Sequence, residues 1–136
     1  MAEAASPSFS AIRLQYTPDR QLAVLTFLQS DLRSPILIRR LEEEMLQIAK
    51  TMECRRLVVD FGGVTVAPTA ILGLVLQLVV DARERGIRVR VCNLAPVIRK
   101  AFDLLNAKGL VPVYENRKAA IADAWEKSDK KKWWFF

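Results

Sequence analysis

The sequence predicts a single α/β domain built on a mixed, mostly parallel sheet of about five strands with about four helices. Three observations lead to this fold class. Strand-like and helix-like patterns alternate after an initial hairpin, in the order ββαβαβαβα. The segment 56–61 has a continuous apolar core, Leu57 to Val59, as in a parallel strand that is covered on both faces. The 136 residues are 51% hydrophobic, which is ample for one packed core.

The first part of the chain predicts a hairpin followed by a helix. Residues 12–16 alternate between apolar and polar, and the apolar run 22–28 follows a turn sequence at 17–20. A helix is predicted over about 34–52, with Ser34 as its N-cap. Apolar residues at helical spacing mark its buried stripe, namely Leu37, Leu41, Met45, Ile48 and Met52.

The rest of the chain repeats strand and helix three times. The predicted strands cover residues 56–61, 87–92 and 111–114. The predicted helices run over 69–85, from after Pro96 to near Gly109, and over 116–126. Within the strand 87–92, Arg88 and Arg90 alternate with apolar residues and are predicted to face outward.

The composition excludes several kinds of catalytic chemistry. The chain has no histidine, so Ser-His, Cys-His and Zn-His sites are impossible. Cys54 and Cys92 form no CxxC pair and are interpreted as buried or half-buried thiols. Gly62-Gly63 is a turn signal and not part of a nucleotide-binding motif. We therefore expect a protein that is not an enzyme and needs neither cofactor nor metal.

The charge and hydropathy patterns bear on partners and location. Of the net charge of +6, residues 127–136 supply +3 and the other 126 residues +3, which does not predict direct nucleic-acid binding. The longest apolar run, 70–80, contains Gly73 and Gln77 and is too short to span a bilayer. Residues 1–10 lack the pattern of a secretory signal. A cytoplasmic location is the expectation.

The C-terminal segment has an unusual composition. Lys130 to Lys132 precede two tryptophans and two phenylalanines, at 133–136. Such a segment suits an anionic membrane surface, a groove on a partner, or contact with its own domain. A disordered terminus is the simpler interpretation. The predicted organisation is a domain over 10–126, an N-terminal extension over 1–9 and a basic-aromatic tail over 127–136.

One ordered set of motifs resembles a known family. An apolar strand ends in Asp60, and a turn, Gly62-Gly63-Val64-Thr65, follows it. A helix then begins around Thr69 and contains the pair Leu72-Gly73 in its first turns. Arg83 to Gly86, a strand, and Cys92 to Pro96 continue the series. Over residues 10–126 this set resembles the STAS domain family, which includes anti-sigma factor antagonists. The resemblance implies a STAS-type fold and a role in transcription regulation through docking to a partner protein.

The resemblance also implies a site. In phosphorylatable members, a serine at the helix start is modified by a partner kinase that is also an anti-sigma factor, and the modification abolishes binding. The family's aspartate falls on Pro68, its first serine on Thr69, its second serine on Ala70 and its glycine on Ile71. Thr69 is thereby the candidate phospho-acceptor, and the implied partner is an anti-sigma factor and serine-threonine kinase of the GHKL type. The implied partner-binding residues are Ala67, Pro68, Thr69, Ala70, Ile71, Leu72, Gly73, Asn93 and Leu94.

The residues alone leave alternatives for the local role of Thr69 and for the function of the protein. The Thr69 hydroxyl is interpreted as a phospho-acceptor at a helix N-terminus, as a helix cap, or as both. Asp60 is predicted to bind N–H groups of the turn that follows it. The first functional hypothesis is a partner-switching regulator controlled by phosphorylation at Thr69. The alternative is a non-phosphorylated scaffold or membrane-peripheral module that uses the tail at 127–136.

Overall fold

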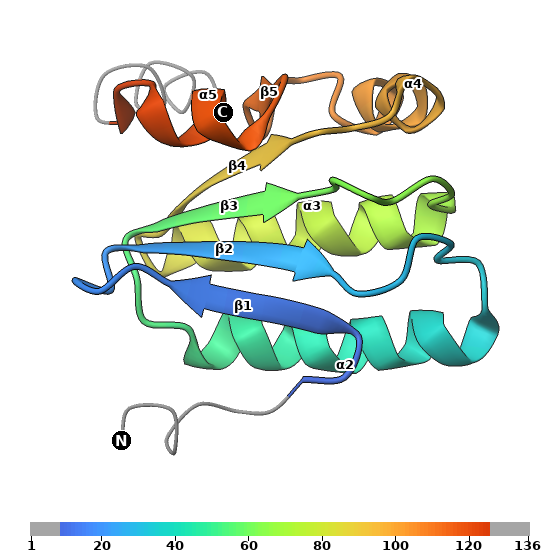
Figure 1. Cartoon of the computed structure of the whole chain (residues 1–136), viewed down its shortest axis with the longest axis horizontal. Helices are drawn as coiled ribbons and strands as arrows, with labels where there is room; N and C mark the ends of the chain where they lie inside the picture. The colour runs from blue at the N-terminus through green and yellow to red at the C-terminus, as the bar shows by residue number, and fades with distance from the viewer. Residues whose placement is uncertain (1–8, 126–136) are drawn as a thin grey trace.

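The computed structural model describes residues 9–125, which form one five-stranded sheet with helices on both faces (Figure 1). The strands are β1 (Ile12–Tyr16), β2 (Leu22–Phe27), β3 (Arg56–Asp60), β4 (Arg88–Cys92) and β5 (Val113–Tyr114). The helices are α2 (Pro35–Thr51), α3 (Thr69–Glu84), α4 (Pro96–Leu105) and α5 (Arg117–Ala122). No helix within these residues is long and apolar enough to cross a membrane.

The order of the strands in the sheet is the order in the chain, β1-β2-β3-β4-β5. β1 runs antiparallel to β2, and β2 to β5 are parallel to one another. The prediction of a mixed, mostly parallel sheet of five strands with four helices is therefore confirmed. β5 is shorter than predicted because Val111 exchanges two hydrogen bonds, of 2.9 and 3.1 Å, with the side chain of Asn106 and not with β4.

Two apolar clusters cover the two faces of the sheet. Alternate residues of β2 to β4, such as Leu25, Leu57 and Val91, pack against α2, α3 and α4 in the larger cluster. The other residues of these strands face α5. They form the smaller cluster, which consists of Leu22, Val24, Val58, Cys92, Ala120 and Trp125. The apolar residues of β3 thus pack into both clusters, as the sequence predicted.

Side chains satisfy backbone groups at both ends of α2. Ser34 is its N-cap as predicted, and its hydroxyl accepts a hydrogen bond from the Leu37 N–H at 3.3 Å. At the other end, the Arg85 guanidinium donates to the carbonyl oxygens of Ala49 and Met52 at 2.8 and 2.7 Å. These contacts satisfy groups that a helix leaves without partners at its ends.

Glu44 is a buried acid on the inner side of α2. Its side chain is only 9% exposed and accepts hydrogen bonds from the N–H groups of Ser10 and Ala11 at 2.9 and 3.0 Å. The Ser10 hydroxyl donates to the same carboxylate at 2.9 Å. Glu44 therefore fastens the residues before β1 to α2.

Arg90 is fully buried, so the prediction that it faces outward is wrong. Its guanidinium donates to the carbonyl oxygens of Ala120, Asp123 and Ala124 at 2.8, 3.0 and 3.1 Å. It also lies 3.8 Å from the ring centroid of Trp125. The polar side of β4 is covered because α5 crosses it, and Arg90 holds the C-terminal end of that helix.

Candidate docking site

Three loops meet at the carboxyl ends of the parallel strands, where the arrowheads point in Figure 1. The loop 28–34 contacts the loop 61–68 because Ser30 accepts hydrogen bonds from the N–H groups of Thr65 and Val66, at 2.8 and 3.2 Å. The Leu32 N–H donates to the Val66 carbonyl at 2.9 Å. We call these two loops, the loop 93–95 and the first turns of α2, α3 and α4 the carboxyl pole.

Asp60 connects the loops of the carboxyl pole with α5. Its Oδ1 accepts hydrogen bonds from the Gly62 N–H at 2.7 Å and from Asn93 Nδ2 at 2.8 Å. Its Oδ2 accepts from Arg117 Nε at 2.7 Å, and the Asp60 side chain is buried. The predicted bond to the following turn is confirmed. One carboxylate thus sets the relative positions of the β3–α3 loop, the β4–α4 loop and the start of α5.

The backbone around this carboxylate requires particular residues. Asn93 has a φ of 61° and Gly63 a φ of 88°, both in the left-handed region that asparagine and glycine adopt most readily. A Cβ atom added at Gly62 would lie 3.0 Å from Asp60 Oδ1. The glycine at 62 therefore allows the close approach through which the turn binds the carboxylate.

The polar network fixes the charge states of its members. Burial raises the pKa of Asp60, but hydrogen bonds from Asn93, Gly62 and Arg117 outweigh burial and hold that pKa below its ordinary value of 3.8. Burial and the charge of Asp60 raise the pKa of Cys92 to about 12. Cys92 is buried and Cys54 half-buried, as predicted, and neither forms a disulfide. At neutral pH the site holds a carboxylate and a protonated thiol, so Cys92 is not an activated nucleophile.

The lowered pKa of Asp60 predicts a loss of stability in acid. The folded state favours the carboxylate, so its contribution is complete above about pH 4, the unfolded value, and disappears as pH falls through the lower folded pKa. Urea unfolding between pH 7 and acid pH should show this decline, and Asp60→Asn should remove part of it. Glu115→Gln, at an exposed acid, serves as control. An identical pH dependence in Asp60→Asn and the native protein would contradict the assignment.

Thr69 is the first residue of α3 and is exposed. The N-cap position belongs to Pro68, and no side chain caps the helix. The interpretation of Thr69 as the helix cap is therefore wrong, because its hydroxyl lies one residue beyond the position from which a cap binds the free N–H groups. Within residues 9–125 the Thr69 hydroxyl makes no hydrogen bond, so it has no structural role there.

The residues predicted to bind a partner divide by exposure. Ile71 and Leu72 are fully buried, belong to the larger core and can only support the surface from beneath. The others reach the surface of the carboxyl pole or the adjoining side of α3: Thr69, Ala70 and Gly73 are exposed, and Ala67, Pro68, Asn93 and Leu94 are half-buried. A Cβ atom at Gly73 would meet nothing within 4 Å, so packing inside the protein does not require that glycine.

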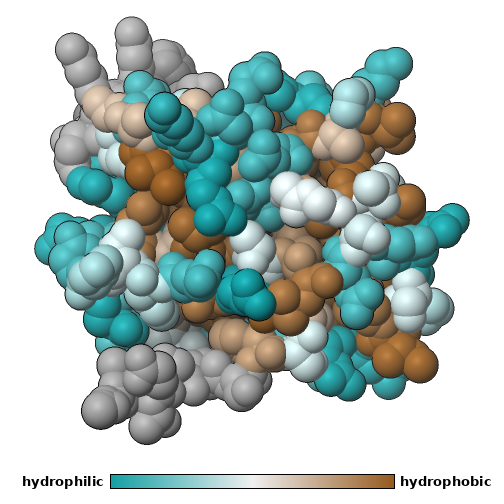
Figure 2. Space-filling view, in the orientation of Figure 1, coloured by the Kyte–Doolittle hydropathy of each residue, from teal (hydrophilic) through white to brown (hydrophobic). Residues whose placement is uncertain are grey.

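The carboxyl pole also carries exposed apolar side chains that the sequence did not single out. Ile36 is 77% exposed, Val97 is 80% exposed and Leu28 is 45% exposed. Ile36 and Val97 are the second residues of α2 and α4, as Ala70 is of α3. Hydrophobic residues are visible on the side of the molecule that holds these helix starts (Figure 2). The proline at the first position of α2 and α4 was the sequence signal that could have placed them.

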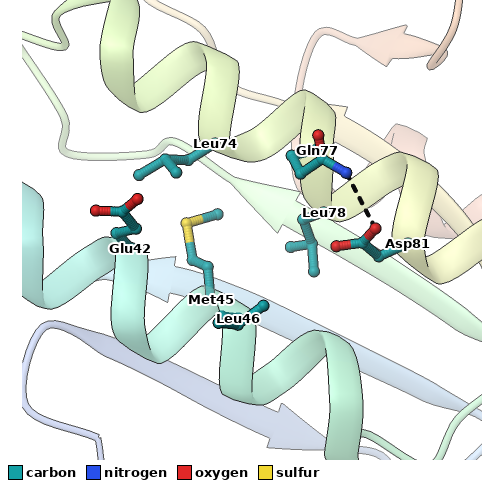
Figure 3. A pocket seen from close by; sticks show the side chains of 7 residues that line it. All are labelled: Glu42, Met45, Leu46, Leu74, Gln77, Leu78 and Asp81. Carbon is teal, nitrogen blue, oxygen red and sulfur yellow. Dashed lines mark hydrogen bonds between the residues drawn. The ribbon is translucent and has the colours of Figure 1, made fainter.

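A groove lies between the middle turns of α2 and α3 (Figure 3). Its volume is about 150 Å³, and its apolar lining comes from Met45, Leu46, Leu74 and Leu78. Small-molecule sites usually measure roughly 300–1,000 Å³, so the groove is too small for such a ligand. Within residues 9–125 no group of three or more Cys, Asp or Glu side chains is placed to hold a metal ion.

Comparisons with known proteins find similarity to one domain family. A family profile described as the STAS domain matches residues 33–120. Curated protein sequences give no match. An anti-sigma-factor antagonist (STAS) domain protein from Planctomyces limnophilus has 16% identity and a TM-score of 0.67, covering 80% of this chain and 93% of its own.

Two structures of the anti-sigma factor antagonist SpoIIAA are also similar, each at 16% identity. The unphosphorylated form has a TM-score of 0.58 and covers 93% of this chain and 100% of its own. The phosphorylated form, from Bacillus, has a TM-score of 0.60 and covers 81% of this chain and 96% of its own. At these identities the structural likeness establishes a shared fold.

Proposed function

This chain belongs to the STAS domain family, and from that premise we propose that it is a regulatory docking protein of the anti-sigma factor antagonist type. It acts in the cytoplasm by partner switching and catalyses no reaction. The observation that carries the proposal is the carboxyl pole, where exposed apolar side chains and an exposed threonine lie at the same end of the sheet.

The composition of the carboxyl pole suits a protein partner. Ile36, Ala70 and Val97 project from three neighbouring helix starts, and no acidic residue lies in the first turn of these helices. The exposed ion pair between Asp31 and Arg33, at 2.7 Å, lies in one of the three loops. Apolar anchors beside polar residues are typical of protein interfaces, in which a few central side chains supply most of the affinity.

Thr69 gives this surface a means of control. A phosphate there would add about −1.5 to −2 charges at the start of α3, where the helix dipole tolerates an anion, so the fold would persist. Binding of the partner would bury that charge against apolar side chains, and the desolvation cost would oppose binding. The similarity to SpoIIAA, which has a phosphorylated form, supports control by phosphorylation. The partner that the family resemblance implies is an anti-sigma factor and serine-threonine kinase of the GHKL type.

The alternative function depends on residues 127–136, which lie outside the described part of the chain. It is a non-phosphorylated scaffold or membrane-peripheral module that uses the basic-aromatic tail. It predicts that Thr69 carries no phosphate after incubation with a kinase and that the tail is needed for binding.

Phosphate mapping tests the proposed switch. The purified protein is incubated with the cognate anti-sigma kinase and ATP, and the modified peptide is identified by mass spectrometry. We expect phosphate on Thr69 in the native protein, none in Thr69→Ala, and unchanged labelling in Thr65→Ala, which removes a neighbouring exposed hydroxyl. Phosphate on another residue, or on none, would refute control through Thr69.

A pair of substitutions at Thr69 tests the effect of charge on docking. Thr69→Glu should weaken partner binding by about tenfold or more, equivalent to about 1.4 kcal/mol, because it brings a carboxylate into an apolar interface. Thr69→Val has nearly the same shape without a charge and should bind almost as the native protein does. Calorimetric titration measures both, and equal affinities for the two variants would contradict the prediction. Because the position is exposed, both should unfold within about 0.5 kcal/mol of the native protein.

A further inference from the structure

Three segments come together at the amino ends of the parallel strands, opposite the carboxyl pole. They are the hairpin turn 17–21, the segment 50–56 and the segment 83–88. The Gln21 carbonyl accepts hydrogen bonds from the N–H groups of Arg55 and Arg56, at 2.9 and 3.0 Å, and the Arg88 N–H donates to the Arg55 carbonyl at 3.0 Å. Arg56 and Arg88 are also direct neighbours in the sheet register. We call these three segments the basic edge.

Most of the domain's net positive charge is concentrated there. The basic residues are Arg20, Lys50, Arg55, Arg56, Arg83, Arg85 and Arg88, and the acidic residues are Asp19, Glu53 and Glu84. The basic edge therefore has a net charge of +4, whereas residues 9–125 together have +5. Hydrophilic residues gather on the side of the molecule where the β1–β2 turn projects (Figure 2).

Three of these arginines contact aromatic rings or carbonyl groups, and the charge of Arg56 also acts on Asp19 within the basic edge. The Arg20 guanidinium lies 4.0 Å from the ring centroid of Tyr16, and that of Arg56 lies 5.9 Å from the ring centroid of Trp125. Arg85 donates to two carbonyl oxygens at the end of α2. Rings and carbonyl groups orient a guanidinium without cancelling its charge, so the basic edge presents fixed cations to an external anion.

We propose that the basic edge is a binding surface for a membrane that contains anionic phospholipids. Basic residues close to such a surface strengthen binding, because the anionic headgroups attract their charges. The exposed residues Arg20, Lys50 and Arg55 can reach headgroup phosphates without any change of fold.

The sequence that follows the domain favours a membrane over an acidic protein or a nucleic acid. The described chain ends at Trp125, whose ring lies near Arg56 on this edge. Residues 126–136 continue from that point and include four lysines and four aromatic residues. Cations joined with tryptophan and phenylalanine match the two layers of a membrane interface, the charged headgroups and the outer acyl region.

The geometry gives this binding an orientation. The basic edge lies at the amino ends of β2 to β4 and the carboxyl pole lies at their carboxyl ends, so the two surfaces are at opposite ends of the strands (Figure 1). A protein attached to a membrane through the basic edge would hold Ile36, Thr69 and Val97 toward the aqueous phase. Membrane attachment and the proposed docking can therefore occur together, and the first does not depend on the second.

Vesicle co-sedimentation of the full chain tests the proposal. We expect binding to vesicles of equal parts phosphatidylcholine and phosphatidylglycerol, and little binding to phosphatidylcholine alone. The double substitution Arg20→Glu and Arg55→Glu should weaken partitioning by about tenfold or more, because both residues would change from attracted to repelled. Arg20→Gln with Arg55→Gln should give a smaller loss. High salt should reduce binding of the native protein.

The matched control is the double substitution Arg39→Glu and Lys118→Glu, which changes the net charge equally at exposed positions outside the basic edge. It should bind nearly as the native protein does, and circular dichroism verifies that all variants fold. Equal losses in the two charge-reversed proteins would show a general charge effect and overturn the proposal. Unchanged binding in the Arg20/Arg55 variant, or binding only to an acidic protein or nucleic acid, would overturn it too.

Thiol labelling tests the orientation. Cys54 lies within the basic edge and is half-buried, and burial raises its pKa more than the charges of Arg85 and Arg20 lower it. Anionic vesicles should slow the reaction of Cys54 with an uncharged maleimide, whereas a cysteine introduced by Thr69→Cys should react at an unchanged rate. Protection of the cysteine at 69 with no protection of Cys54 would show the opposite orientation and overturn the proposal.

Discussion

Substitution of Arg90 by alanine should lower the free energy of unfolding by about 3 kcal/mol or more, because hydrogen bonds to charged groups contribute roughly 1.5–3 kcal/mol each. Arg90 is fully buried and donates to three carbonyl oxygens at the end of α5. Its removal would leave these carbonyl groups without their donor and would leave a cavity beneath Trp125. In a domain of ordinary stability, about 5–15 kcal/mol, such a loss is severe.

Urea unfolding followed by tryptophan fluorescence and circular dichroism measures the effect. Arg90→Lys should recover less than half of the loss, because a single ammonium cannot reproduce the fork of the guanidinium. Arg13→Ala is the control. Arg13 lies in β1 on the same face of the sheet as Arg90, but it is exposed, so its removal should change the free energy of unfolding by no more than about 0.5 kcal/mol. A loss below about 1 kcal/mol in Arg90→Ala would show that Arg90 does not hold α5.

Substitution of Val97 by glutamate should weaken partner binding by about thirtyfold or more, equivalent to about 2 kcal/mol, the level that marks a central interface residue. Val97 is 80% exposed at the start of α4, so its replacement should leave the fold intact. The reason for the loss is the burial of a carboxylate among apolar side chains without an opposite charge. The prediction depends on the proposed docking function.

Leu104 provides an unusually close control on the same helix. It is 81% exposed, seven residues after Val97 and therefore near the same side of α4, but it lies at the end remote from the carboxyl pole. Leu104→Glu should retain nearly full affinity in the same titration, while both variants should unfold like the native protein. Equal losses in the two variants would place the interface along α4 as a whole, and no loss in Val97→Glu would exclude this part of the carboxyl pole.

The helices and strands could be predicted because each depends on a local pattern. The apolar spacing of 34–52, the Ser34 cap and the apolar core of the strand 56–61 each act within one element. The resemblance of 57–73 to the STAS family was equally local and led to the correct fold. The bond of Asp60 to the next turn could likewise be predicted, since its partner is two residues away.

The features that could not be predicted depend on how distant elements meet. Alternation in β4 correctly indicates that Arg90 lies on the face opposite Val91, but it cannot show that α5 covers that face. The partnership of Asp60 with Arg117 joins residues 57 positions apart. The exposure of Ile36 and Val97 follows from the gathering of three helix starts at one end of the sheet, which no single helix encodes.

The agreement between strand order and chain order bears on how the protein folds. Each strand pairs with the one before it, so the sheet can grow from the β1–β2 hairpin one crossover at a time. The helix α5 is different, because it returns across the sheet to bring Arg117 to Asp60. We expect α5 to dock after the sheet has formed, so the contacts of Arg90 should slow unfolding more than they speed folding.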